Sequence, residues 1–210
     1  MARSKSSGNW LKEHFNDKYV QQAQDLGYRS RAAFKLLQIQ QKDRLIKPGM
    51  TVVDLGAAPG GWSQIAAPLV GHKGRVIALD ILPMEALPHV EFIQGDFREA
   101  DVLTQLEQLL DGKAIDLVIS DMAPNMSGDD SIDQPRIMLL ADLALEFATQ
   151  HLRPEGTFLV KIFQGSEFQE YVQQMRTLFN KVIARKPDAS RSRSSEVYLL
   201  GIGGKSGSKP

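Results

Sequence analysis

The stretch Val53-Asp54-Leu55-Gly56-Ala57-Ala58-Pro59-Gly60-Gly61-Trp62 decides the fold class of this chain. An apolar run enters a Gly-rich turn and a helical pattern leaves it, which is the context of a nucleotide-type cofactor loop. The turn is not the dinucleotide fingerprint G-x-G-x-x-G. Pro59 also removes one backbone N–H that could hold a pyrophosphate. The stretch therefore predicts a strand, a cofactor loop and a helix, and it disfavours a dinucleotide.

Apolar runs alternate with helical patterns on both sides of this loop, which is typical of βαβ units around a parallel sheet. Seven strands are predicted: Thr51 to Leu55, Arg75 to Asp80, Val90 to Gln94, Ile115 to Ser120, Gly156 to Ile162, Lys181 to Arg185 and Glu196 to Ile202. Helices are predicted at about Arg29 to Leu45, Gly61 to Val70, Asp101 to Leu110, Pro135 to His151 and Glu167 to Phe179. Only residues 186–195 separate the last two strands, so these should pair antiparallel. The fold class is therefore α/β, a Rossmann-like seven-stranded sheet that is mostly parallel with one antiparallel strand and has helices on both faces.

The composition is that of a globular chain. The 210 residues are 42% hydrophobic and 24% charged, which excludes disordered, collagen-like and coiled-coil classes. No apolar run could span a bilayer and the polar start does not resemble a secretory signal, so we expect a cytoplasmic protein. The absence of cysteine excludes disulfides, thiolate zinc sites and cysteine nucleophiles. No metal site is expected, because the histidines show no ligand spacing. They are His14, His72, His89 and His151.

Charge is segregated along the chain although basic and acidic residues balance overall. Residues 1–50 hold ten Lys/Arg against four Asp/Glu, residues 51–180 hold eight against nineteen, and residues 181–210 hold seven against two. Basic ends around an acidic centre are expected where the ends bind a polyanion, although they can also be simply solvated. We expect a partly flexible basic arm over residues 1–28, a single domain over 29–203 and a flexible tail over 204–210.

Aspartates stand at or near the ends of four successive predicted strands. They are Asp54, Asp80, Asp96 and Asp121. Ligands of such sheets bind outside the carboxyl ends of the strands. Four carboxylates there would repel a pyrophosphate but suit a cationic ligand that carries hydroxyls and amines, as S-adenosylmethionine does. Any one aspartate could be a helix cap, but four in succession favour S-adenosylmethionine as the cofactor.

The acceptor side follows the fourth strand. Asp121-Met122-Ala123-Pro124 lacks the aromatic residue usual in methyltransferases that act on amines, and C5-pyrimidine methylation usually needs a cysteine. An oxygen acceptor is the simplest remaining case. Lys161 stands alone in the apolar run from Phe158 to Phe163, and such a lysine either functions there or extends from the strand end to solvent. Lys35 and Glu196 are further candidate site residues, and together with Asp121 they favour a functional role for Lys161.

The sequence resembles the FtsJ-like family of RNA 2′-O-ribose methyltransferases, and particularly its bacterial members, from about Asn16 to Gly203. Five ordered matches carry the resemblance: Tyr28-Arg29-Ser30-Arg31-Ala32-Ala33-Phe34-Lys35-Leu36, Asp54 to Trp62, Ser120 to Pro124, Val160-Lys161 and Lys186-Pro187-x-Ala189-Ser190-Arg191-x-x-Ser194-x-Glu196. The resemblance implies the Rossmann-like fold of S-adenosylmethionine-dependent methyltransferases and a catalytic tetrad of Lys35, Asp121, Lys161 and Glu196. It also implies cofactor contacts from Gly60, Trp62, Asp80, Asp96 and Asp121, to which the Gly-rich turn adds Asp54, Gly56 and Pro59.

The implied substrate is a uridine ribose in the A-loop of 23S rRNA, methylated by a monomer on the assembling large ribosomal subunit. A ribose 2′-hydroxyl is a poor nucleophile, so its attack on a methyl group needs alignment and removal of its proton. Lys161 would act either as a neutral base or as a cation that steers the oxygen lone pair. Asp121 would orient Lys161, Lys35 would position the acceptor or a phosphate, and Glu196 would hold the lysines.

RNA contacts are expected from Arg29, Arg31 and Lys35 on one helix and from Lys186, Arg191 and Arg193 in the last hairpin loop. Contacts of this kind position RNA without reading its sequence. Three other classes of function compete with this one. An NAD-dependent oxidoreductase lacks its fingerprint here, and a non-catalytic RNA-binding factor leaves Lys161 unexplained. A tRNA ribose methyltransferase remains open, because motifs shared by the superfamily do not select the RNA.

Overall fold

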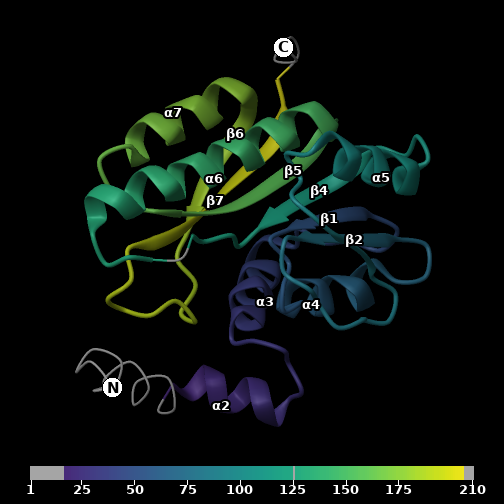
Figure 1. Ribbon diagram of the computed structural model, residues 1–210, viewed down its shortest axis with the longest axis horizontal. Helices are drawn as coiled ribbons and strands as arrows, with labels where there is room; N and C mark the ends of the chain where they lie inside the picture. Colours follow the sequence, from purple (N-terminus) through teal and green to yellow (C-terminus); the bar gives the residue numbers. More distant parts are fainter. Residues whose placement is uncertain (1–16, 125, 206–210) are drawn as a thin grey trace.

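The computed structural model describes residues 17–124 and 126–205 (Figure 1). Seven strands form one sheet in the order β3-β2-β1-β4-β5-β7-β6. Their bounds are Thr51–Leu55 (β1), Arg75–Asp80 (β2), Glu91–Gln94 (β3), Ile115–Ser120 (β4), Leu152–Phe163 (β5), Phe179–Arg185 (β6) and Glu196–Gly204 (β7). Strand β7 is antiparallel to both of its neighbours, β5 and β6, while the other pairs are parallel. The predicted α/β class and its single reversed strand are confirmed.

Helices cover both faces of the sheet, and each face has its own apolar core (Figure 1). Helices α3 (Ala32–Asp43) and α4 (Gly61–Val70) pack on one face, and α5 (Ala100–Leu110), α6 (Asp130–His151) and α7 (Phe168–Leu178) pack on the other. Side chains alternate between the two faces along a strand. In β5, Phe158 and Val160 therefore join the core under α5, α6 and α7, while Leu159 joins the core under α3 and α4.

The basic arm contains a helix that the sequence pattern does not predict. Helix α2 spans Lys18–Asp25 and packs beside α3 (Figure 1). The side chain of Asp17 caps it by accepting a hydrogen bond from the Tyr19 N–H at 3.0 Å, and Val20 and Ala23 are its buried residues. The rest of the expected arm, residues 1–16, and the tail over 206–210 lie outside the described residues. Within the described ranges, no helix has the length and apolar character needed to cross a lipid bilayer.

Three predicted boundaries are wrong by three residues or more, and the first is that of β5, which begins at Leu152 and not at Gly156. The other two are helix starts. Helix α3 begins at Ala32 and not at Arg29, because the segment before it is held by contacts to other loops. Arg29 is consequently not on one helix with Lys35. Helix α6 begins at Asp130, five residues before the predicted Pro135. Asp129 caps it there by accepting a hydrogen bond from the Ser131 N–H at 2.9 Å.

Candidate active site

Lys161 and Asp121 meet at the carboxyl edge of the sheet. Strands β4 and β5 are parallel and pair Ser120 with Val160, so the residue that follows each lies at the same level. The Lys161 Nζ atom donates to the backbone oxygen of Asp121 at 2.6 Å and lies 3.1 Å from its Oδ1 atom. Only 9% of Lys161 is exposed. Its ammonium is therefore held inside the protein and does not extend into solvent.

Lys35 and Glu196 form a second ion pair close by. The Lys35 Nζ atom lies 2.8 Å from Oε1 and 2.9 Å from Oε2 of Glu196, and both residues are buried. Because β7 runs against β5, it begins where β5 ends, and Glu196 pairs with Phe163 in the sheet. Helix α3, which packs on the same face of the sheet as α4, brings Lys35 to this edge. All four residues predicted as a catalytic tetrad are thus gathered at one edge, as two ion pairs.

Tyr198 joins the two ion pairs, and the sequence analysis does not identify it. Its hydroxyl donates to Oδ1 of Asp121 at 2.7 Å, and it pairs with Lys161 in the register of β5 and β7. The Lys35 Nζ atom lies 5.7 Å from the centre of the Tyr198 ring, within the range of a cation–π contact. Tyr198 follows Glu196 by two residues on a strand, so the two side chains share a face. That spacing is the sequence signal that could have identified it.

The surroundings of Asp121 favour its ionised form. Burial is the largest single influence and raises the pKa of Asp121, but the charges of Lys161 and Lys35 and the hydrogen bond from Tyr198 outweigh it and leave the pKa below its ordinary value. The pKa of Tyr198 is raised well above its ordinary value, first by burial and then by the charges of Asp121 and Glu196. Asp121 therefore stays a carboxylate and Tyr198 stays a neutral donor at neutral pH.

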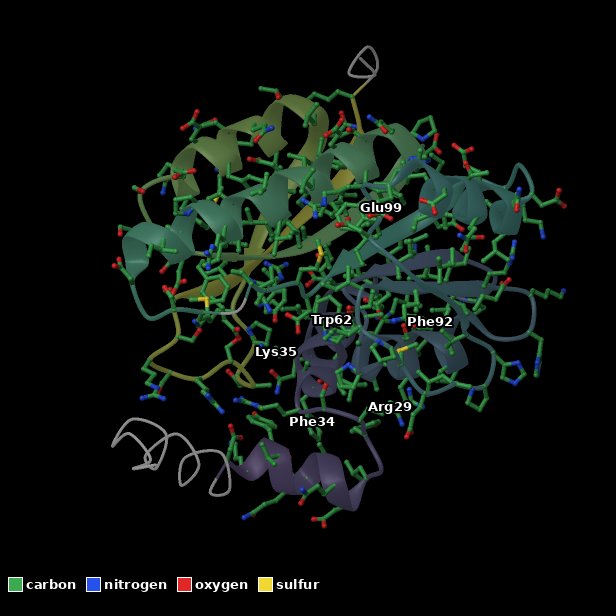
Figure 2. The ribbon with its side chains drawn as sticks, viewed as in Figure 1. Arg29, Phe34, Lys35, Trp62, Phe92 and Glu99 are labelled. Atoms are coloured by element: carbon green, nitrogen blue, oxygen red, sulfur yellow. The ribbon has the colours of Figure 1, made fainter. Side chains whose placement is uncertain are left out.

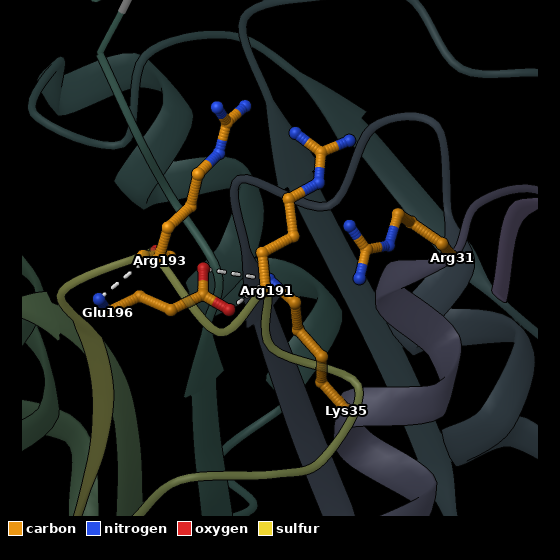
Figure 3. Close-up of a pocket in the computed structure, with 6 residues that line it drawn as sticks. Arg31, Lys35, Arg191, Arg193 and Glu196 are labelled. Atoms are coloured by element: carbon orange, nitrogen blue, oxygen red, sulfur yellow. Dashed lines mark hydrogen bonds and ion pairs between the residues drawn. The ribbon is translucent and has the colours of Figure 1, made fainter. Parts of the chain in front are cut away.

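A basic cavity of about 510 Å³ opens beside the Lys35–Glu196 ion pair. It is lined by Arg31, Lys35, Arg191, Arg193, Ser194 and Glu196. Figure 3 shows the three guanidinium groups pointing into the same region beside that ion pair. Four of the six residues predicted to contact RNA are therefore brought together here.

The other two predicted RNA contacts, Arg29 and Lys186, hold the protein's own backbone. The guanidinium of Arg29 donates to the carbonyls of Pro59 (3.1 Å), Glu85 (2.7 Å) and Ala86 (2.8 Å). It thus ties the segment before α3 to the cofactor loop and to the loop after β2 (Figure 2). The ammonium of Lys186 donates to the carbonyl of Ser194 in the β6–β7 loop and to the carbonyl of Glu196 at the start of β7.

A second cavity, of about 650 Å³, lies outside the ends of β1, β2 and β4. Four predicted cofactor residues line it: Gly56, Asp80, Asp96 and Asp121. Its walls also include apolar side chains such as Leu79, Phe97 and Leu139. Asp80 accepts hydrogen bonds from the backbone N–H groups of Ala58 and Leu82, each at 2.8 Å, and so shapes the loops around this cavity.

The sequence analysis does not identify the arginines at the rim of this cavity. Arg98 and Arg136 both line the cavity. The guanidinium of Arg98 forms an ion pair with Asp96, and this hydrogen-bonded contact holds the pKa of Asp96 below its ordinary value. The rim is therefore less acidic than four successive aspartates suggest.

Asp54 does not reach this rim, although it was predicted as a cofactor residue. It is 1% exposed and accepts a hydrogen bond from the Ser63 hydroxyl at 2.7 Å. Burial raises its pKa to about 7, even though the hydrogen bond from Ser63 acts in the opposite direction. The cause is its place inside β1, every residue of which is buried. Asp54 therefore links β1 to α4 behind the cofactor loop.

Pro59, Gly60 and Trp62 also lie outside the lining of this cavity. The indole of Trp62 is 3% exposed, donates to the Ala32 carbonyl at 2.8 Å and lies against Tyr198, with ring centres 5.7 Å apart. It belongs to the core between α3 and α4 (Figure 2).

Gly56 is required where the cofactor loop leaves β1. Its φ is +74°, and a Cβ atom there would lie 2.2 Å from Cγ of Met122. The loop after β1 and the loop after β4 therefore approach each other more closely than any side chain allows.

Comparisons with known proteins agree with this geometry. The profile of the FtsJ-like methyltransferase family matches residues 28–204. A ribosomal RNA large subunit methyltransferase E from Chromobacterium violaceum is 66% identical over 203 residues, covering 97% of this chain and 99% of its own. A protein of the same name from Pseudomonas fluorescens is 61% identical over 203 residues, or 97% of each chain. A crystal structure from Plasmodium falciparum, assigned as a ribosomal RNA methyltransferase, matches with a TM-score of 0.76 at 29% identity, covering 84% of this chain and 98% of its own.

Proposed function

This chain belongs to the FtsJ-like methyltransferase family, and we propose that it transfers a methyl group from S-adenosylmethionine to a ribose 2′-hydroxyl of large-subunit ribosomal RNA. More closely, the target is a uridine in the A-loop of 23S rRNA, methylated on the assembling large subunit. One observation carries the proposal. Asp121 lines the cavity of about 650 Å³, Lys35 and Glu196 line the basic cavity, and Tyr198 contacts both Asp121 and Lys35. A cofactor site and a polyanion site thus adjoin one cluster of lysines and carboxylates.

The residues of the 650 Å³ cavity suit S-adenosylmethionine. The volume lies within the usual range for a small-molecule site, and apolar side chains alternate with a few carboxylates there. Asp80 and Asp96 offer acceptors for hydroxyl and amine groups, and the charge of Asp121 suits a sulfonium. When bound, this cofactor supplies a positively charged methyl donor.

Lys161 is the residue that we assign to the acceptor hydroxyl. An ammonium has three N–H donors, and Asp121 accepts two of them, through its backbone oxygen and Oδ1. The third remains available to an acceptor oxygen, whose lone pair it orients toward the methyl group. In this role Lys161 steers the acceptor oxygen as a cation, and the hydroxyl proton leaves late, to water.

Asp121 and Tyr198 act through Lys161. The carboxylate of Asp121 fixes the ammonium, and the Tyr198 hydroxyl fixes the carboxylate. Lys35 and Glu196 form the adjoining wall of the basic cavity, where they hold the ribose or its phosphate. Binding groups that are already placed this way reduce the entropy lost on alignment of the reacting atoms.

The basic cavity supports RNA as the acceptor. Three arginines surround it, and guanidinium groups bind phosphate with two parallel hydrogen bonds. The names of the relatives from Chromobacterium and Pseudomonas point to large-subunit ribosomal RNA. The choice of a uridine in the A-loop rests on the family resemblance.

The test is transfer of labelled methyl from S-adenosylmethionine to three acceptors lacking the modification: large-subunit particles, free 23S rRNA and bulk tRNA. The product is then mapped for 2′-O-methylated nucleotides. We expect one site in 23S rRNA, in the A-loop, with particles as the best acceptor. Methylation of tRNA alone would refute the ribosomal assignment, and methylation of a base would refute the oxygen acceptor.

A further inference from the structure

The carboxylate of Asp17, just before helix α2, contacts two arginines of the basic cavity. The Oδ2 atom of Asp17 lies 2.7 Å from Nη1 of Arg31 and 3.6 Å from Nε of Arg191. Its Oδ1 atom accepts the hydrogen bond from Tyr19 that caps α2. Only 10% of the Asp17 side chain is exposed. A single, largely covered carboxylate therefore joins the start of α2 to two cations of the cavity.

The arginines offer more donors than Asp17 uses. Arg31 also donates through Nη2 to the Ala189 carbonyl, but its Nε atom is buried and has no hydrogen-bond partner among the described residues. The Nε atom of Arg191 is also buried without a hydrogen-bond partner there, because 3.6 Å from Asp17 is too long for a hydrogen bond. Buried donors without partners are rare, and they mark a place where a ligand completes the hydrogen bonding. Both arginines line the cavity, together with Arg193. A tetrahedral anion with several oxygens would satisfy these donors better than one carboxylate oxygen does.

We propose that Asp17 occupies the place of an RNA phosphate in the free protein, and that the phosphodiester next to the target ribose displaces it. The proposal rests on the proposed function, because Lys35 and Glu196, which would hold that ribose, line the same cavity. A carboxylate and a phosphate carry like charge and cannot share the two guanidinium groups at contact distance. RNA binding therefore separates Asp17 from Arg31 and releases the cap of α2.

The first test is the substitution Asp17→Asn, measured by equilibrium binding to in vitro transcribed 23S rRNA. Asparagine caps a helix as well as aspartate does, so the change removes the charge and keeps the cap. The expected result is tighter binding by about 3- to 10-fold, the scale of one weakly screened charge pair. Equal or weaker binding would overturn the proposal.

Asp25→Asn is the matched control. Asp25 ends the same helix, is exposed and makes no hydrogen bond or ion pair with the described residues. It changes the net charge of α2 equally, so its affinity for rRNA should stay within about twofold of wild type if contact with the arginines is the cause. In an Arg191→Ala background the gain from Asp17→Asn should shrink. An equal gain from both aspartate variants would mean that the effect is only one of net charge.

Hydrogen exchange of the first turn of α2 gives a readout independent of affinity. Displacement of Asp17 removes the acceptor of the Tyr19 N–H, so exchange there should speed up when 23S rRNA binds. RNA that merely covered α2 would slow it, and that result would overturn the proposal. Failure of the proposed function looks different: the protein would bind rRNA and respond at Asp17 but transfer no methyl to it.

Discussion

Tyr198 and Asp121 are joined by a hydrogen bond of 2.7 Å from the phenol hydroxyl to Oδ1, the same oxygen that lies 3.1 Å from the ammonium of Lys161. One carboxylate oxygen thus serves two donors that come from neighbouring strands. The position of the ammonium depends on that of the carboxylate, and the carboxylate depends on the phenol. In the proposed mechanism Tyr198 is a positioning residue, separated from the acceptor oxygen by Asp121 and Lys161.

Tyr198→Phe should slow methyl transfer without weakening substrate binding. The ring remains to pack on Trp62, but Asp121 loses one hydrogen bond to a charged group, a loss of about 1.5 to 3 kcal/mol. We expect kcat to fall by about tenfold or more while the KM values for cofactor and rRNA stay near wild type. Single-turnover transfer to large-subunit particles measures it. Unchanged turnover would show that the phenol does not position Asp121.

Lys161→Ala should lose methyl transfer by on the order of a hundredfold or more, because it removes the group assigned to the acceptor oxygen. The variant should still bind S-adenosylmethionine and rRNA, since a contact that matters in the transition state contributes little to either ground-state complex. Lys181→Ala, an exposed lysine on β6, is the matched control and should keep full turnover. Turnover of Lys161→Ala close to that of the control would exclude Lys161 from catalysis.

Asp54→Asn should change how stability depends on pH. The pKa of Asp54 is raised by burial from 3.8 to about 7, so between these values the folded protein holds a proton that the unfolded chain has released. This proton stabilises the folded protein fully below the lower pKa. The stabilisation decreases as pH rises between the two values, and above pH 7 the total loss is at most about 4 kcal/mol. The variant keeps the hydrogen bond from Ser63 and lacks this decrease.

Urea unfolding of wild type and Asp54→Asn at several pH values between 5 and 8, roughly the range in which Asp54 titrates, measures the difference. The variant should gain stability relative to wild type as pH rises. Ser63→Ala removes the hydrogen bond that lowers the pKa of Asp54 in the folded protein, so it should extend the decrease to higher pH. A pH-independent difference between wild type and Asp54→Asn would mean that Asp54 is ionised throughout.

Arg29→Ala and Arg193→Ala should have different effects, although the sequence analysis assigns an RNA contact to both residues. Arg29 donates to three backbone carbonyls around the cofactor loop, so its loss should lower the melting temperature and weaken S-adenosylmethionine binding. Arg193 lines the basic cavity, so its loss should weaken rRNA binding and leave cofactor binding intact. Calorimetry with the cofactor and filter binding with rRNA measure the two effects. The same loss profile in both variants would contradict the assignment.

The sheet could be predicted because its strands are continuous apolar runs bounded by clear turns. Even the reversed strand followed from the short connection before Glu196. Helix boundaries were less accessible. Asp17 and Asp129 start helices through single side-chain caps that short polar segments do not distinguish from loops. The start of α3 depends on distant loops that hold Arg29, which no local pattern contains.

The candidate site divides in the same way. Lys161, Asp121 and Glu196 are conspicuous because they are charged residues in or beside buried strands. Lys35 lies on a helix, and the four residues were joined as a tetrad by the resemblance to the family. Tyr198 gives a weaker signal: its spacing from Glu196 puts the two on one face, but a tyrosine in a strand is ordinary until its hydroxyl is seen to meet Asp121. Asp54 is predicted on the cofactor rim because it stands near the end of a strand, whereas its side chain turns back to Ser63. The direction of a side chain at a strand end depends on packing that spacing does not encode.

The insertion of β7 between β5 and β6 fixes when this site can come into being. Every other strand precedes β7 in the chain, yet β7 occupies an interior position in the sheet and carries both Glu196 and Tyr198. During synthesis the cofactor cavity can form first, because its residues all lie before residue 144. The acceptor side must wait for the last strand to leave the ribosome and find its place. A chain without β7 thus lacks the acceptor side of the site together with core residues on both faces of the sheet.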